Sequence, residues 1–302
     1  MHAMNTAWQR GRVWGLTGLL LGFAVGCGGE PIATPGGVAA SGMAQAAPAP
    51  TPAVEAAAAA PAPATAQLLG LYVGMFKATK FDKNKKPMYE NKITVSVDSV
   101  EAGQIVGHSV VAGNSRPFRG TITQLPNGFS VQAREPGDDR YDGTFTFVID
   151  PSGSSMSGAW KANDTALSVT ERGYTLEKRT FSYNPALQLD MSSIPEFYWD
   201  DSTEPLTPDA GKFNASIYRL KATDIENMYK GDLGAMRNAI YARHGYSFKT
   251  RNWRALFDNY VPWYMPVAVD VSAEITPVEK ANIELIKRYE AHAASSYDQF
   301  GR

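Results

Sequence analysis

The chain has 302 residues, of which 29 are Lys or Arg and 30 are Asp or Glu, so its formal net charge at pH 7 is −1. This balance creates no strong field to attract a polyanion and argues against nucleic acid as a partner. The single cysteine, Cys27, excludes an internal disulfide framework.

The first 26 residues are typical of a secretory signal peptide. Arg10 and Arg12 precede an apolar run over residues 13–25, and no acidic residue occurs before Glu30. A basic segment, a short apolar segment and small residues at a cleavage point mark such a signal. The run is about a dozen residues long, whereas a helix needs roughly 20 to span a bilayer. Export is therefore favoured over a permanent transmembrane anchor.

The end of this segment, Ala24-Val25-Gly26-Cys27, resembles a bacterial lipobox, although Leu is commoner at the position of Ala24. The resemblance implies cleavage before Cys27, lipid on that residue, and membrane lipid as a partner. Each buried CH₂ of such a lipid contributes about 0.8 kcal/mol, so two or three acyl chains anchor stably. Gly28 in place of Asp resembles the default sorting to the outer membrane where a cell has two membranes. We therefore expect an exported lipoprotein whose folded part is periplasmic or surface-exposed.

Residues 27–66 form a segment rich in Ala, Pro, Gly, Thr and Val, with almost no charge and no aromatic residue. Such a composition cannot bury enough apolar surface to offset its ordering entropy. Its prolines favour extended conformations, at roughly 3.1 Å per residue. The sequence predicts a disordered tether between the lipid and the folded part.

Residues 67–183 change character abruptly and predict an antiparallel β domain. Apolar and polar residues alternate in short runs bounded by Gly, Pro, Asn and Asp, which is the pattern of strands. Eight strands are expected, over residues 69–76, 93–100, 105–111, 120–123, 129–133, 144–149, 156–161 and 166–178. Because no helical pattern interrupts them, they indicate a closed barrel or a sandwich. The opening and closing segments are similar in architecture to lipocalin- or avidin-like barrels, but no biotin-site residue can be matched.

One polar stretch of this domain, residues 112–119, is a candidate binding loop. It places Asn114, Arg116 and Arg119 beside an aromatic residue. Paired arginines can bind a carboxylate or a phosphate. A solvated turn explains the same residues equally well.

Residues 184–209 are expected to connect the barrel to a helical domain over residues 210–296. Thr223-Asp224-Ile225-Glu226 has the spacing of a capping box at the start of a helix. Apolar residues then recur at helical spacing as far as His244. Gly245 is placed to end this helix in a left-handed conformation.

A last helix is expected to begin at Thr276. Pro277 occupies the first helical position, where its missing N–H costs nothing. Glu279 lies three residues after the threonine, so the two side chains have the spacing of a capping box.

Residues 241–245 spell Tyr-Ala-Arg-His-Gly, the motif for which the YARHG domain is named. The flanking residues agree with that family, and the resemblance extends from Leu233 to Ile286. It implies an extracellular bacterial domain that no catalytic activity defines.

The motif permits two interpretations. Arg237, Tyr241 and His244 share one helical face, while Arg243 points elsewhere and is expected to stack on an aromatic ring. The available rings are those of Trp253, Trp263 and Tyr264. These residues either join the helix end to the aromatic loop or form a binding cluster for an acidic peptide stem or a glycan. Catalysis is disfavoured because His244 has neither a cysteine or serine partner motif nor a metal-binding HExxH companion.

The sequence thus predicts an α+β chain, with an antiparallel barrel-like or sandwich domain followed by a small, mainly helical domain after a disordered tether. The favoured function is non-enzymatic binding or scaffolding in the cell envelope. The expected partner is a cell-wall polymer or an envelope protein, and no cofactor, metal or catalytic residue is expected.

Two alternative functions remain open. A small-molecule carrier that uses the barrel requires a deep apolar cavity. An envelope hydrolase requires carboxylates such as Glu135, Asp138 and Asp139 to converge in one cleft with a raised pKa.

Overall fold

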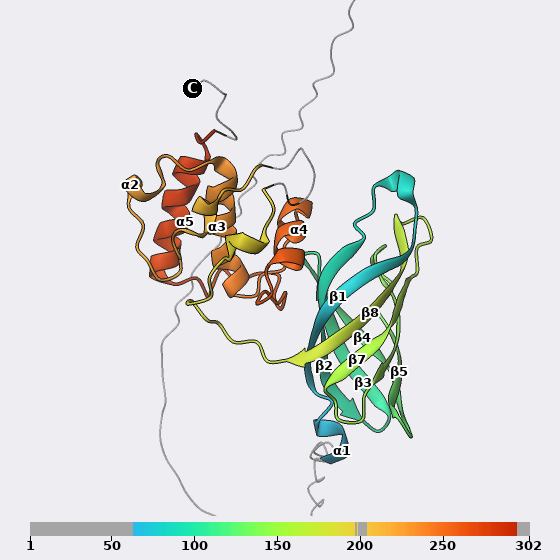
Figure 1. Ribbon diagram of the computed structural model, residues 1–302. Helices are drawn as coiled ribbons and strands as arrows, with labels where there is room; N and C mark the ends of the chain where they lie inside the picture. The colour runs from blue at the N-terminus through green and yellow to red at the C-terminus, as the bar shows by residue number, and fades with distance from the viewer. Residues whose placement is uncertain (1–62, 197, 199–203, 295–302) are drawn as a thin grey trace, which may run out of the picture. The chain divides into compact units, whose positions relative to one another are not determined.

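The computed structural model describes residues 63–196, 198 and 204–294 (Figure 1). The predicted signal peptide, residues 1–26, and Cys27 lie outside these residues, as does the predicted tether up to residue 62. The last four residues of that tether form a short helix, α1 (Pro63–Ala66). No helix in the described ranges is long and apolar enough to span a membrane.

Eight antiparallel strands follow and close into a barrel (Figure 1). They are β1 (Gly70–Phe81), β2 (Glu90–Glu101), β3 (Gln104–Val111), β4 (Asn114–Leu125), β5 (Gly128–Arg134), β6 (Gly143–Ile149), β7 (Ser155–Ala162) and β8 (Val169–Arg179). Each strand pairs with the next, and β8 pairs with β1 over the register from Leu71↔Arg179 to Phe81↔Val169. The prediction of a barrel or sandwich is confirmed as a closed barrel, in which no strand edge is left unpaired.

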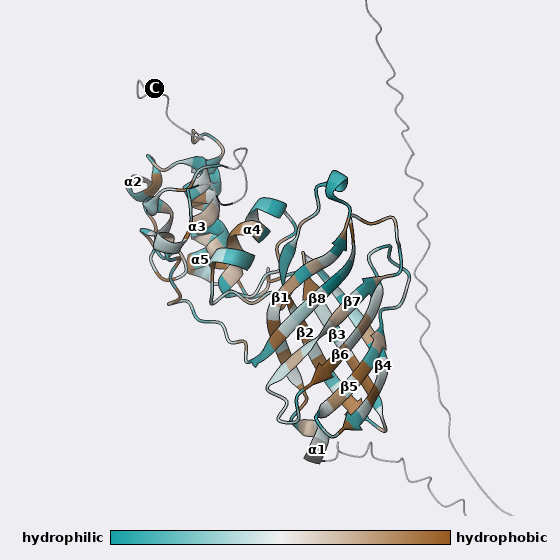
Figure 2. Ribbon diagram, turned by 45° about the vertical axis from the view of Figure 1, so that its right-hand side comes forward, coloured by the Kyte–Doolittle hydropathy of each residue, from teal (hydrophilic) through white to brown (hydrophobic). Residues whose placement is uncertain are grey.

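The alternation within each strand sorts side chains between the barrel interior and its outer face. In β2, Ile93, Val95 and Val97 are all buried and belong to the interior core. Figure 2 shows hydrophobic and hydrophilic residues interspersed along the strands in this way. Some large rings pack directly over a glycine of a facing strand: a Cβ on Gly107 would lie 2.5 Å from the Phe118 ring. The core is therefore filled by aromatic side chains that pack over small residues.

One end of the barrel is plugged by the chain segment that leads into β1. Leu68 and Tyr72 are fully buried. The Tyr72 hydroxyl lies within hydrogen-bond distance of two carbonyls, that of Leu68 at 2.9 Å and that of Gly153 at 3.0 Å, and shares its one proton between them. Toward the other end of the barrel, buried polar side chains line the interior, namely Asn91, Ser109, Glu135 and Arg172. The interior thus changes from apolar to polar along its length.

The predicted helical domain contains α2 (Ala222–Ile225), α3 (Lys230–Arg243), α4 (Arg251–Tyr260) and α5 (Pro277–Glu290). Helices α3 and α5 pack side by side, as Figure 1 shows. Their shared core includes Leu233, Met236, Ile240, Ile283 and Ile286. The fold class predicted from the sequence is confirmed.

The two predicted capping boxes have different outcomes. Thr276 caps α5 as expected, since its hydroxyl accepts from the Glu279 N–H and its own N–H donates to the Glu279 carboxylate. The box predicted at Thr223 and Glu226 is wrong. Helix α2 begins one residue before Thr223, because the Asp224 carboxylate accepts the N–H of Lys221 at 2.8 Å and takes the role given to Glu226.

The segment expected only to connect the domains, residues 184–209, packs into the helical domain. Leu189, Ile194, Tyr198 and Leu206 are buried in the same core as residues of α3 and α4. Apolar side chains at these positions make the segment part of the helical fold rather than a free linker.

Candidate functional site

A cavity of about 590 Å³ lies in the barrel at the end away from Tyr72. This volume is in the range of sites for small molecules. Apolar side chains form much of its wall, among them Phe76, Ile93, Phe145, Trp160 and Leu167. Buried polar side chains also line it, namely Asn91, Ser109, Glu135 and Arg172. The cavity that a carrier requires is therefore present, but its lining is mixed rather than purely apolar.

The charged residues of the cavity are mostly basic. The lining residues include one carboxylate, Glu135, against seven cationic side chains. These are Lys85, Lys86, Arg116, Arg172, Lys249, Arg251 and Arg254. A concave site with such an excess of one charge concentrates the opposite charge.

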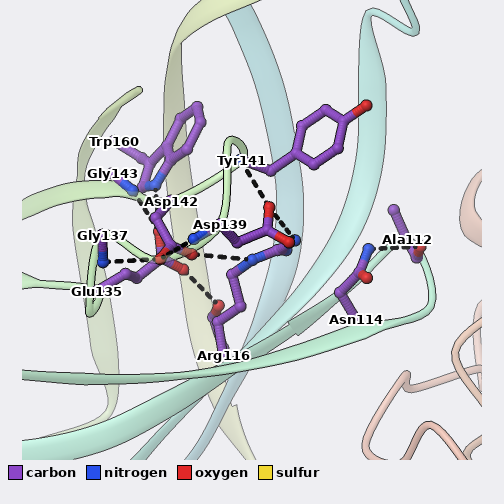
Figure 3. Close-up of polar contacts among 11 residues, drawn as sticks. Ala112, Asn114, Arg116, Glu135, Gly137, Asp139, Tyr141, Asp142, Gly143 and Trp160 are labelled. Atoms are coloured by element: carbon purple, nitrogen blue, oxygen red, sulfur yellow. Dashed lines mark hydrogen bonds and ion pairs between the residues drawn. The ribbon is translucent and has the colours of Figure 1, made fainter. Parts of the chain in front are cut away.

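Glu135 follows β5 and turns inward beside Trp160 (Figure 3). Its Oε2 accepts from the Gly143 N–H at 2.7 Å and from Trp160 Nε1 at 3.0 Å. Its Oε1 accepts only a long bond, 3.4 Å, from the Ser109 hydroxyl. Burial raises the pKa of Glu135 to about 7, despite the opposing effect of these hydrogen bonds and of Arg116. The carboxyl group therefore holds its proton to a higher pH than an exposed glutamate does.

The residues predicted to form a binding loop at 112–119 lie mostly on a strand, so that expectation is corrected. Strand β4 begins at Asn114, because residues 114–121 continue the ladder with β3. Alternation along β4 then separates the two arginines. Arg116 and Asn114 line the cavity, whereas Arg119 is exposed and does not.

Arg116 is held by two aspartates (Figure 3). Its Nε lies 3.1 Å from Asp142 Oδ1, and its Nη2 lies 3.3 Å from Asp139 Oδ1. A hydrogen bond from the Tyr141 N–H, with help from Arg116, lowers the pKa of Asp139. Of the carboxylates proposed for a hydrolase, Glu135 has a raised pKa and Asp139 a lowered one. The arrangement does not match a pair of carboxylates that share one reacting group.

Two further arginines come from β8 and from α4. Arg172 is fixed by the barrel itself, since its guanidinium donates to the carbonyls of Phe76, Met88 and Tyr89 at 3.0, 2.9 and 3.3 Å. Burial, with a contribution from Arg254, lowers its pKa to about 10. Neither arginine was predicted from the sequence, because the position of Arg172 depends on the register of the closed barrel and that of Arg254 on the contact of α4 with β2.

The Arg254 side chain reaches from α4 to the start of β2. Its Nη1 donates to Asn91 Oδ1 at 3.1 Å, and its Nε is buried with no hydrogen-bond partner among the described residues. Nearby, Lys92 donates to the carbonyl of Val261 at 3.0 Å. Burial lowers the pKa of Lys92 and raises that of its neighbour Asp258. Polar contacts between β2 and α4 therefore border the cavity.

In the motif at residues 241–245, Arg243 is buried. Its Nε donates to the carbonyl of Leu187 at 2.8 Å and its Nη1 to the Ser216 hydroxyl at 3.2 Å. The guanidinium lies 5.8 Å from the Trp263 ring centroid, so it stacks on one of the rings expected from the sequence. Burial lowers its pKa to about 10. Arg243 thus ties the end of α3 to the segment before the domain.

His244 ends α3 and contacts the buried carboxylate of Glu279. Its Nε2 lies 2.8 Å from Glu279 Oε2, and its ring stacks on that of Tyr183 at 4.2 Å. The Tyr183 hydroxyl donates to Glu279 Oε1 at 3.1 Å. Burial alone would raise the pKa of Glu279, but hydrogen bonds from Ser216, Thr276 and His244 outweigh it and lower the pKa. The sequence offered Glu279 only as a helix cap and gave no signal of this second role.

Arg237 and Tyr241 also lie on α3 but line a different cavity from Arg243. Arg237 forms a two-point ion pair with Glu290, at 2.8 and 2.9 Å. Tyr241 and Trp253 line a second cavity of about 340 Å³ together with Arg237. The structure thus places Arg237 and Tyr241 together and separates them from Arg243.

Gly245 is required by its backbone conformation and by its surroundings. Its φ is +77°, in the left-handed region that side chains rarely adopt. A Cβ there would also lie 2.3 Å from Val267 Cγ2. The predicted glycine end of the helix matches this geometry.

The chain thus combines an eight-stranded antiparallel barrel, which holds a cavity of mixed lining, with a helical domain that buries Arg243 and His244 at one helix end. Comparison with known families assigns the second part: the model of the YARHG domain matches residues 214–291. The chain therefore carries a YARHG domain at its C-terminal side, within the predicted bounds of 210–296. No curated protein and no solved structure matches the chain.

Replacing Arg243 by Ala is expected to lower the free energy of unfolding by about 3 kcal/mol, because it leaves the Leu187 carbonyl and the Ser216 hydroxyl without their buried donor. Urea denaturation followed by far-ultraviolet circular dichroism measures this loss. Arg219 is exposed on the same domain, so Arg219→Ala is the control and should change stability by less than about 0.5 kcal/mol. Equal stability of the two variants would contradict a structural role for Arg243.

Replacing Glu135 by Gln is expected to change how stability depends on pH. A folded pKa of about 7 is above the ordinary value of 4.5, so the folded state binds the proton more tightly than the unfolded state. The wild type should therefore lose up to about 3 kcal/mol, relative to Glu135→Gln, as pH rises from about 4.5 to about 7. Thermal unfolding across this range tests the sign. Glu101→Gln, at an exposed position, is the control and should retain the wild-type slope.

Proposed function

We propose that this chain is a non-enzymatic binding protein of the bacterial cell envelope that takes a small molecule into the cavity of its barrel. The observation that carries the proposal is the cavity of about 590 Å³, whose lining combines an apolar wall of aromatic and aliphatic side chains with polar and basic side chains. Sites for small molecules combine these two features, because apolar walls supply affinity and a few polar groups fix orientation. The proposal therefore favours a small-molecule carrier, which was one of the two alternatives open from the sequence, over a purely scaffolding protein.

Binding is favoured over hydrolysis by the state of the carboxylates. Glu135 has a raised pKa, but its Oε2 already accepts two hydrogen bonds, from Gly143 and Trp160. Asp139 is paired with Arg116, and Asp142 accepts from that arginine as well. The acidic groups are thus engaged in holding the rim of the cavity.

The location in the envelope is the second part of the proposal. The apolar run over residues 13–25 and Cys27 support export and lipid attachment, with sorting to the outer membrane in a cell that has two. The YARHG domain at residues 214–291 agrees with a place outside the cytoplasm. A cell-wall polymer or an envelope protein is the proposed partner of the anchored chain.

The cavity is tested by filling it. Val111 lines the cavity and Val148 lies exposed on β6, so Val111→Trp and Val148→Trp form a matched pair. The neutral fluorescent probe N-phenyl-1-naphthylamine should bind the wild type and Val148→Trp alike. Its affinity for Val111→Trp should fall by on the order of tenfold, because the indole occupies the probe's space. Equal binding by both variants would place the probe elsewhere and contradict the proposal.

The anchor is tested by Cys27→Ser. This variant should lose incorporation of labelled fatty acid and leave the membrane fraction, because no thiol remains for the lipid. Gly29→Ser, two residues away, should remain membrane-bound and labelled. Normal lipid labelling of Cys27→Ser would overturn the lipoprotein interpretation.

A further inference from the structure

The cavity is completed by residues from outside the barrel. Lys249, Arg251 and Arg254, at the start of α4 and just before it, contribute to its lining. These residues belong to the YARHG domain, which begins at residue 214. Lys85 and Lys86, from the turn between β1 and β2, line the same region. The site therefore has a barrel wall and a basic rim to which the helical domain contributes.

Specific hydrogen bonds hold the YARHG residues against the barrel. The Gly113 N–H donates to the Ser247 hydroxyl at 2.9 Å, and this contact is buried. Arg251 Nη2 donates to the Lys86 carbonyl at 2.7 Å. The stem of Lys249 lies across Gly113, where an added Cβ would come within 2.1 Å of the Lys249 Cγ. These contacts hold the chain around Ser247 and Arg251 against the barrel end, and the side chains of Lys249 and Arg251 are exposed at the rim.

Part of this positive charge has no acidic partner among the residues that the structure describes. Arg172 donates only to backbone carbonyls. The ammonium groups of Lys86 and Lys249 form no ion pair within the part of the chain that the structure describes. Arg116, by contrast, is neutralised by Asp139 and Asp142. Lys85 lies 3.9 Å from Asp82, and the buried carboxylate of Asp258 acts on Arg254. Within the described residues, the cavity charge without an acidic partner is therefore that of Arg172, Lys86 and Lys249.

The deeper wall has the opposite character. Phe76, Phe145 and Trp160 present rings to the cavity, and Ile93 and Leu167 add aliphatic surface. Between these rings and the rim, Glu135 Oε1 accepts only one long bond, from Ser109 at 3.4 Å. That oxygen is available to a hydroxyl or amide N–H of a ligand.

We propose that the ligand of this cavity is an anionic amphiphile, a molecule with an apolar body and a single carboxylate, sulfonate or phosphate, whose charged group is bound by the basic residues of the YARHG domain. The apolar body lies against Phe76, Phe145 and Trp160. The anionic group lies at Lys249, Arg251 and Arg254, so the YARHG domain forms part of the ligand site. This inference rests on the proposed small-molecule function and specifies its ligand class.

Two probes that share a ring system separate the two proposals. N-phenyl-1-naphthylamine is neutral, and 1-anilinonaphthalene-8-sulfonate adds one sulfonate to the same rings. Both are titrated into the purified full-length chain at low and at high salt. The double variant Lys249→Glu/Arg251→Glu reverses the rim charge. Lys280→Glu/Lys287→Glu makes the same change in net charge at exposed positions on α5, away from the cavity lining.

The rim variant should weaken binding of the sulfonate probe by about tenfold or more at low salt, and the effect should shrink at high salt. Its affinity for the neutral probe should change by less than about twofold. The α5 variant should bind both probes as the wild type does. Unchanged circular dichroism and melting temperature establish that the rim variant is folded, and Lys249→Gln serves as a milder substitution if it is not.

The alternative outcomes are distinct. If neither probe binds the wild type in a Val111→Trp-sensitive manner, the proposed small-molecule function fails and this inference fails with it. If the neutral probe binds in the cavity but the rim variant leaves sulfonate binding unchanged, the small-molecule function stands and the charge assignment is overturned. Equal loss of both probes in the rim variant also overturns it.

The need for both halves of the ligand is tested by competition with the sulfonate probe. Decanoate should displace it at concentrations about tenfold lower than either decanol or acetate. Decanoate presented in vesicles of neutral phospholipid and decanoate free in solution distinguish a membrane source from a soluble one. Displacement by acetate as effective as by decanoate would show that the apolar wall is not used.

Discussion

The structure depends first on the pairing of β1 with β8, which closes the barrel. Closure converts the period-two alternation of each strand into an inside and an outside. The same constraint directs Glu135 and Arg172 inward, although both are charged and both must be compensated there. Arg172 meets this requirement with backbone carbonyls of the β1–β2 region. A buried cation is thus satisfied without a carboxylate, and its charge remains available to the cavity.

The helical domain also contains a buried charge that must be compensated, and here the charge is negative. Glu279 is fully buried and accepts from Thr276, Tyr183 and His244. Its compensation therefore comes from the helix that it caps, from the segment after the barrel and from the end of α3. One carboxylate joins three elements that are distant in sequence. The Tyr-Ala-Arg-His-Gly motif, through His244 and Arg243, supplies the groups at the helix end, and its glycine provides the turn that follows.

The strands, the closed or layered β architecture, the last helix and the YARHG domain can be predicted from the sequence, because each depends on local periodicity or on a contiguous motif. The start of β4 was predicted too late in the chain, and Arg116 and Arg119 were therefore predicted to lie in one loop. The strand begins earlier because its ladder with β3 extends beyond the residues that alternate visibly. Arg172 and Arg254 were not predicted to line the cavity. Their position follows from barrel register and from the contact of α4 with β2, and neither is encoded in local spacing.

The contact between α4 and β2 also explains why two separate folds can share one site. Asn91 lines the cavity and accepts from Arg254, and its neighbour Lys92 donates to the Val261 carbonyl, so both residues contact the helical domain. A single strand thus carries both the wall of the cavity and the surface that positions its basic rim. Any shift of α4 along β2 would move Lys249 and Arg251 relative to the aromatic wall. The geometry of the site is therefore set by the packing between the domains as much as by either fold alone.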